Sequence, residues 1–108
     1  MQLTCEETDA ALVVRFAGEI IMDAVTECRA EVEHLALAAA APAVVVDLSG
    51  VAFMDSSGVG FLIGLRRLCQ DHGKTLSLAN PTPPIKKLLA MLRLTEYFDA
   101  PPTDPAGV

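Results

Sequence analysis

Apolar residues follow two different periods along this chain, and segments of the two kinds alternate. Residues 12–16 are rich in β-branched and aromatic side chains, which predicts a strand closed by a turn at Gly18. Residues 43–48 form a short valine-rich run, typical of a central strand covered on both faces, and the chain then turns at Gly50. Residues 75–79 alternate weakly and predict another strand.

Three further segments have apolar residues at the three-and-four spacing of an amphipathic helix. The first begins at Ala24, with Asp23 as its N-cap, and is ended by Pro42. The second covers residues 59–70 and stops at Gly73, and the third follows a proline-rich loop. The predicted buried stripes are Val25, Cys28, Val32, Leu35, Ala36 and Ala39; Phe61, Leu62, Leu65, Leu68 and Cys69, with Arg66, Arg67 and Gln70 opposite; and Ile85, Leu88, Leu89 and Leu92.

Alternating strands and helices require right-handed crossovers, so the inner strands are expected to be parallel. With an edge strand from residues 1–4, the sequence predicts an α/β domain. Its mixed, mostly parallel inner sheet has four to five strands, with helices packed on it. One domain is expected over residues 1–100. Residues 101–108, with three prolines and a glycine, are expected to form a flexible tail.

Composition narrows the classes of function. The chain has 108 residues, 52% of them hydrophobic, which is enough to bury a core. Its net charge is −6, with 14 acidic and 8 basic residues and no basic block, which argues against nucleic-acid binding. Residues 1–9 lack the features of a secretory signal, and no apolar run approaches the roughly 20 residues of a membrane-spanning helix. We therefore expect a cytoplasmic protein without membrane insertion.

The three cysteines, Cys5, Cys28 and Cys69, are far apart, with no histidine at ligand spacing. Neither a metal site nor a disulfide framework is indicated, and no cofactor is expected. Cys28 and Cys69 fall among apolar neighbours, so we expect inert packed thiols, a reactive cysteine being the alternative.

The most informative residues are Asp55, Ser56, Ser57 and Gly58, where a strand pattern changes to a helix pattern. Such a run exposes a serine Oγ at a helix N-terminus, where free N–H groups and the helix dipole favour an anion such as a phosphate. Either serine or Asp55 could instead cap the helix, but two hydroxyls and a carboxylate exceed what one cap requires. The residues alone do not distinguish Ser56 from Ser57.

Two enzymatic alternatives fit less well, so no catalytic residue is predicted. A nucleophile elbow needs glycine where Met54 stands, and the possible bases, His34 and His72, lie far from Ser56 along the helices. The glycines from Gly58 to Gly64 are spaced one residue too long for a dinucleotide fingerprint. They are better explained as close approaches of the helix to a neighbouring backbone or to a partner.

Residues 44–64, VVVDLSGVAFMDSSGVGFLIG, resemble the signature of the STAS domain, whose best-known members are bacterial anti-sigma factor antagonists. Residues 73–78 and 84–89 extend the likeness to nearly the whole chain. The resemblance implies a phosphorylation-switched binding module of STAS fold rather than an enzyme. Its phosphoacceptor is the serine directly after the aspartate, Ser56, with Ser57 the second choice.

By the same resemblance, the unphosphorylated domain binds an anti-sigma factor serine/threonine kinase and releases the sigma factor, and a serine phosphatase resets the switch. The implied contact surface comprises Phe53, Met54, Asp55, Ser57, Gly58, Val59 and Gly60. Met54 and Val59 are candidates for its apolar part, ordinary core positions being the alternative. Lys86 and Lys87 resemble a basic pair of the family, although a solvated helix face is the simpler explanation.

One position departs from the family. An aspartate is common two residues after the position of Glu19, and here that position is Ile21, with Asp23 the nearest carboxylate. Either Asp23 takes an auxiliary role, or the domain has another kind of partner. The alternative function is a STAS subunit of another assembly, such as a non-sigma signalling complex or a lipid transporter ATPase, held by constitutive contact.

Overall fold

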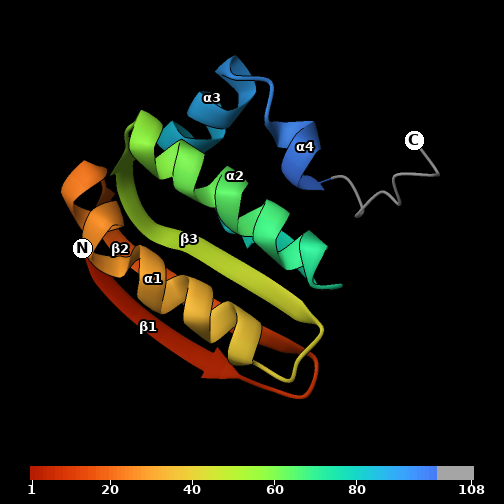
Figure 1. Ribbon diagram of the computed structural model, residues 1–108. Coiled ribbons are helices and arrows are strands. Elements are labelled where there is room, and N and C mark those ends of the chain that lie inside the picture. The colour runs from red at the N-terminus through yellow and green to blue at the C-terminus, as the bar shows by residue number, and fades with distance from the viewer. Residues whose placement is uncertain (100–108) are drawn as a thin grey trace.

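The computed structural model describes residues 1–99, so the predicted tail, 101–108, lies outside the described residues. The elements follow in the order β1 (Gln2–Glu7), β2 (Ala11–Ile20), α1 (Met22–Ala38), β3 (Ala43–Met54), α2 (Ser56–Asp71), β4 (Thr75–Ala79), α3 (Pro83–Met91) and α4 (Thr95–Asp99). Figure 1 shows α1 and α2 lying along the sheet, with α3 and α4 beyond α2. The predicted alternation is confirmed, and α4 is a short helix that the sequence pattern did not indicate.

The sheet has the strand order β1-β2-β3-β4. β1 pairs antiparallel with β2, while β2 with β3 and β3 with β4 are parallel, as the crossovers require. The predicted edge strand is therefore confirmed and runs longer than residues 1–4. Thr8 closes the β1–β2 hairpin, because its Oγ1 accepts hydrogen bonds from the N–H groups of Ala10 and Ala11.

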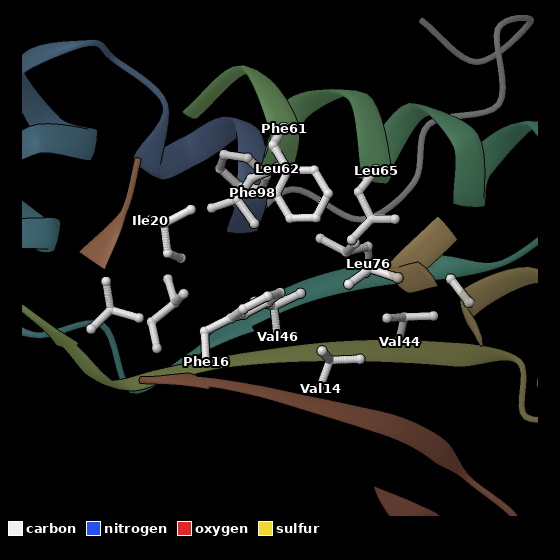
Figure 2. Packing of buried hydrophobic residues seen from close by; sticks show 14 of the residues in the cluster. Val14, Phe16, Ile20, Val44, Val46, Phe61, Leu62, Leu65, Leu76 and Phe98 are labelled. Carbon is white, nitrogen blue, oxygen red and sulfur yellow. The ribbon is translucent and has the colours of Figure 1, made fainter. Parts of the chain in front are cut away.

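All the helices pack on one face of the sheet. Buried side chains from α1, α2, α3 and α4 form a single cluster with alternate residues of β2 and β3, among them Val14, Phe16, Val44 and Val46 (Figure 2). The residues between them, such as Val45, are only half-buried. The expectation that residues 43–48 are covered on both faces is therefore wrong, because no described element lies on the second face.

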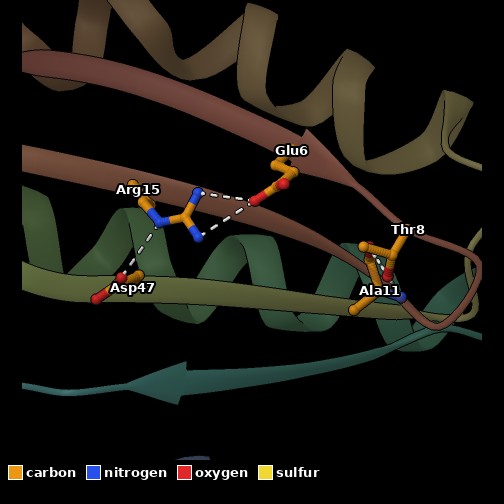
Figure 3. A network of polar contacts seen from close by, with 5 residues as sticks. All are labelled: Glu6, Thr8, Ala11, Arg15 and Asp47. Carbon is orange, nitrogen blue, oxygen red and sulfur yellow. Dashed lines mark hydrogen bonds and ion pairs between the residues drawn. The ribbon is translucent and has the colours of Figure 1, made fainter.

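The open face carries a polar network instead (Figure 3). The guanidinium of Arg15 lies 3.4 Å from Glu6 Oε2 and 3.5 Å from Asp47 Oδ2, so it links three neighbouring strands. The backbone N–H of Ser49 holds the pKa of Asp47 below its usual value, with smaller contributions from the side chains of Ser49, Asn80 and Arg15. Ion pairs this exposed add only about 0–1 kcal/mol each, so this face is polar mainly because it meets water.

Two predicted turns are absent, and both central strands are longer than expected. β2 passes through Gly18, which has φ +100°, to end at Ile20, and β3 passes through Gly50 to end at Met54. The pairing shifts register twice along this stretch and closes on Ile20 opposite Met54. A Cβ on Gly50 would lie 3.0 Å from Ala17 Cβ, so the glycine permits irregular pairing rather than a turn.

The ends of α1 also differ from expectation. The helix begins at Met22, so Asp23 lies in its first turn and is not its N-cap. Ile21 takes the N-cap position in extended conformation and provides no side-chain cap. The last helical residue is Ala38, four residues before Pro42. The predicted stop of α2 is confirmed, since Gly73 follows it with φ +72°.

Two side chains differ in burial from what the predicted apolar stripes of the helices indicated. Arg66 is buried rather than solvated, because α4 packs beside it and brings the Tyr97 ring to 4.3 Å from its guanidinium carbon. Leu92 lies beyond the last turn of α3 and is exposed rather than buried.

The cysteines agree with the prediction of packed thiols. Cys28 and Cys69 are buried, and burial raises the pKa of both thiols, which keeps them protonated at neutral pH. Cys5 is exposed on β1.

Candidate functional site

The candidate site lies at the carboxyl end of the two central strands, where β2 and β3 finish side by side. Ile20 and Met54 are the last paired residues, and the N–H of Asp55 donates to the carbonyl oxygen of Ile20 at 3.3 Å. α1 begins at Met22 and α2 at Ser56. Two helix N-termini, each with unpaired N–H groups, therefore meet at one edge of the sheet.

Asp55 joins these two helices through its carboxylate. Oδ1 accepts a hydrogen bond from the N–H of Gly58 at 3.0 Å, which makes Asp55 the N-cap of α2. Oδ2 accepts from the N–H of Met22 at 3.2 Å, and so satisfies the first turn of α1 as well. The cap is thus the carboxylate and neither serine, and both serine hydroxyls are left for another role.

Ser56 and Ser57 are the first two residues of α2. Ser56 is exposed and Ser57 is half-buried. Within residues 1–99, the Ser56 hydroxyl makes no hydrogen bond to any other group. It stands at the positive end of a helix dipole, where a negatively charged substituent is stabilised.

Gly58 allows α2 to start this close to the strands. A Cβ at this position would lie 2.5 Å from the carbonyl oxygen of Ile20 and 2.5 Å from Met54 Cγ, closer than real contacts permit. Gly60 differs, because nothing lies within 4 Å of where its Cβ would be and the residue is exposed. Packing within the domain therefore explains Gly58 but not Gly60.

The structure divides the predicted apolar contact residues. Met54 and Val59 have 3% and 6% of their surface exposed and belong to the core, because both point toward the covered face of the sheet. Phe53 lies outside that core and is 50% exposed. Met22, which belongs to none of the predicted site motifs, is 63% exposed at the start of α1. Its only sequence signal is an apolar residue immediately before a helix pattern.

Asp23 directly follows Met22, whose N–H binds Asp55, so it lies at the border of the site rather than among residues 53–60. It lines a hollow of about 530 Å³ between the start of β1 and α1, together with Glu19, Ile21 and Glu27. None of residues 53–60 lines this hollow. Asp55 is therefore the carboxylate nearest to Ser56 along the chain, and it is already engaged by two backbone N–H groups.

Neither histidine can serve Ser56 as a base in this arrangement. His72 follows the last turn of α2, about 24 Å from the helix start at 1.5 Å per residue, and its Nδ1 lies 2.9 Å from the Leu68 carbonyl oxygen. His34 lies twelve residues into α1, about 18 Å from the site. Over the described range there is no group of three or more potential metal ligands and no helix long and apolar enough to cross a membrane.

Comparisons with known proteins agree with this geometry. A family model described as Mlab, STAS domain matches residues 3–99. An anti-sigma F factor antagonist from Lysinibacillus sphaericus is 35% identical over 82 residues, covering 75% of this chain and 69% of that protein.

Solved structures of the Bacillus anti-sigma factor antagonist SpoIIAA share the fold at 29% identity. The unphosphorylated form has a TM-score of 0.74 and covers 86% of this chain and 82% of its own. The phosphorylated form has a TM-score of 0.69 and covers 86% and 85%. The family model matches residues 3–99, and the mixed sheet with its helices and the Asp-Ser-Ser-Gly run at the start of α2 agree with that match. The chain therefore belongs to the STAS domain family.

Proposed function

We propose that this protein is a cytoplasmic anti-sigma factor antagonist, a binding module without catalytic activity that is switched by phosphorylation of Ser56. The observation that carries the proposal is the exposed Ser56 hydroxyl, which begins α2 without a partner in the described chain while Asp55 caps the helix. A relative named as an anti-sigma F factor antagonist supports it. So does the similarity to SpoIIAA, which is known in unphosphorylated and phosphorylated forms.

In the unphosphorylated state, the surface around Ser56 docks on an anti-sigma factor serine/threonine kinase, which then releases its sigma factor. Phe53 and Met22 supply exposed apolar area, and Gly60 lets the partner backbone approach α2 closely. The kinase then transfers the γ-phosphoryl group of ATP to Ser56 Oγ: an Oγ–P bond forms, the bond from the γ-phosphorus to the β,γ-bridging oxygen breaks, ADP leaves, and the hydroxyl proton is released to solvent. A serine phosphatase returns the protein to its binding state.

Phosphorylation opposes docking through charge and desolvation. A phosphoserine carries about −1.5 to −2 charges at pH 7, and here it would directly follow Asp55 on the surface to which the exposed Phe53 also belongs. A loss of only about 1.4 kcal/mol weakens binding tenfold. In the free protein the same phosphate lies at a helix N-terminus, where it is stabilised, so the fold tolerates the group that the partner rejects.

Ile21 replaces the aspartate that the family commonly has, so recognition by the kinase must use other groups. Asp23 is the candidate auxiliary carboxylate, and it would have to turn from the hollow in which it lies. If Asp23 assists phosphoryl transfer, Asp23→Asn lowers the rate of Ser56 phosphorylation. An unchanged rate would assign recognition to the residues around α2 alone.

The decisive experiment incubates the purified protein with ATP and each candidate serine kinase of its host, and locates phosphate by intact-mass and peptide mass spectrometry. Ser56→Ala and Ser57→Ala are matched variants of neighbouring hydroxyls. We expect one phosphate, lost in Ser56→Ala and kept in Ser57→Ala, and loss of kinase binding once Ser56 is modified.

Two outcomes would contradict the proposal. Phosphate that persists in Ser56→Ala would move the modification to another residue. Absence of phosphorylation by every kinase, with tight binding to a transporter ATPase that Ser56→Ala does not change, would support the alternative of a constitutive STAS subunit.

A further inference from the structure

The exposed large apolar side chains of the described chain are unevenly distributed. They are Met1, Met22, Leu37, Phe53, Met91 and Leu92. Phe53 is the penultimate residue of β3. Met91 is the last residue of α3, which packs on β3, and Leu92 follows it. Met91 is 72% exposed, although it is the last residue of an otherwise anchored helix. Contiguous exposed apolar surface of this kind marks interaction sites more often than single scattered residues do.

Phe53 and Met91 line one groove, although 38 positions separate them in the sequence. The groove has a volume of about 260 Å³ and is lined by Phe53, Met54, Pro84, Ile85, Lys87, Leu88 and Met91. Its α3 wall is fixed to the strand by Thr82, whose Oγ1 donates to the carbonyl oxygen of Val51 at 2.7 Å. Phe53 stands three residues before Ser56, so the groove opens next to the proposed phosphorylation site.

The one charged side chain among the described residues that line the groove, Lys87, is basic, although the whole protein is acidic. Residues 80–94 contain Lys86, Lys87 and Arg93 and no acidic residue, whereas the complete chain has a net charge of −6. All three basic side chains are exposed, and Lys87 lies on the groove wall. Lys86 and Arg93 line neighbouring hollows, beside α3 and beyond its end. An apolar groove with a lysine on its wall and no acidic residue among the described ones that line it complements an apolar side chain carried on an acidic segment.

We infer that this groove is a second contact with the kinase partner, and that it takes an apolar side chain from an acidic segment of that partner. The identity of the partner rests on the proposed function, whereas the chemistry of the occupant rests on the groove alone. The groove lies between the end of β3 and α3, and Ser56 is not among its lining residues, so it binds by apolar burial and charge, neither of which requires the Ser56 hydroxyl.

Two matched pairs of variants test the groove. Met91→Glu and Leu37→Glu each put a carboxylate on an exposed apolar position, but Leu37 is about 22 Å from the site at the far end of α1. Lys87→Glu and Arg67→Glu each reverse one exposed charge, and Arg67 lies on α2 outside the groove. Unchanged thermal unfolding midpoints would confirm that each variant is folded.

The readout is the kinetics of Ser56 phosphorylation and the affinity for the kinase in ADP. We expect Met91→Glu to raise KM and weaken binding by about tenfold or more, with kcat at saturation unchanged, because the groove binds without touching the reacting atoms. Lys87→Glu should raise KM by a smaller factor. Leu37→Glu and Arg67→Glu should match the wild type. Equal effects of Met91→Glu and Leu37→Glu would overturn the inference.

A second arm separates this inference from the proposed function. If no kinase binds or phosphorylates the wild type, the proposed function fails, and the groove is tested with a synthetic helical peptide of leucines flanked by glutamates. Its control has lysine in place of each glutamate. Shifts of the amide resonances of Phe53, Lys87 and Met91 with the acidic peptide alone would support the groove. No shift, or equal shifts with both peptides, would overturn it.

Discussion

The amino and carboxyl ends of the parallel strands differ in what their polar groups contact. At the amino end, Lys74 Nζ donates to the carbonyl oxygens of Ala39 and Ala41, and the N–H of Ala40 donates to Glu7 Oε2 at 3.1 Å. These contacts join segments more than thirty residues apart and leave the connections on this side bound to one another. Such an end stabilises the fold and has little to offer a partner.

At the carboxyl end, one carboxylate joins the starts of two helices. Asp55 satisfies the first turns of α1 and α2, and this leaves the Ser56 hydroxyl free of partners in residues 1–99. Phe53, three residues before Ser56, is exposed. Binding sites in open α/β sheets lie at this same end, where loops and helix N-termini meet. The contrast indicates that the carboxyl end, unlike the amino end, leaves surface that a partner and a phosphate can contact.

The largest effect we expect comes from crowding the carboxyl end. Gly58→Ala should lower the free energy of unfolding by about 2–3 kcal/mol, because its Cβ would lie 2.5 Å from a backbone oxygen of β2. Gly60→Ala should instead raise it by about 0.5–1 kcal/mol, as a helix residue with no neighbour within 4 Å. Urea unfolding measures both, and equal effects would disprove the close approach at Gly58.

A smaller loss should follow from removing the carboxylate that joins the two helices. Asp55→Ala leaves the N–H groups of Gly58 and Met22 without that acceptor and should lower the free energy of unfolding by about 2 kcal/mol. Asp23→Ala, in the first turn of α1 without a capping contact, should lower it by about 0.5 kcal/mol. If the two variants unfold at the same urea concentration, Asp55 does not bridge the helices.

At the amino end, stability and function should separate. Lys74→Met removes two hydrogen bonds to backbone carbonyls and should lower the free energy of unfolding by about 1 kcal/mol. Ser56→Ala should leave stability unchanged while abolishing phosphorylation. Kinase assays on Lys74→Met should give the wild-type rate at Ser56. A reduced rate would mean that the two ends are coupled.

The smallest effect should lie between the ends, on the open face of the sheet. The pKa of Asp47 is held below its usual value, chiefly by the Ser49 N–H, so its folded form binds a proton less readily than its unfolded form. Its stabilising contribution is present above the unfolded pKa of about 3.9 and is lost as pH falls through the lower folded value. Asp47→Asn should therefore reduce slightly the loss of urea midpoint between pH 6 and pH 3. An unchanged pH dependence would contradict this role.

Local sequence patterns predicted which segments are helices and strands better than they predicted the residues at which these segments begin and end. Valine-rich and alternating runs identified the strands, the three-and-four spacing identified three helices, and Gly73 marked the end of α2. The turns expected at Gly18 and Gly50 are absent, because pairing between β2 and β3 continues through both positions. A glycine permits a turn, a bulge or a close approach, and only the neighbouring strand decides among them.

The candidate site divides in the same way. The sequence by itself determined that a carboxylate and two hydroxyls begin a helix after a buried strand, because capping chemistry and hydrophobic period are local properties of the chain. The tertiary structure decided that Asp55 also binds the N–H of Met22, 33 residues away, that Met54 is core, and that Phe53 and Met91 share a groove. These contacts depend on the packing of β2, β3 and α3 against one another. The hydrophobic period specifies which face of each helix or strand is apolar, but not which distant residues that face will contact.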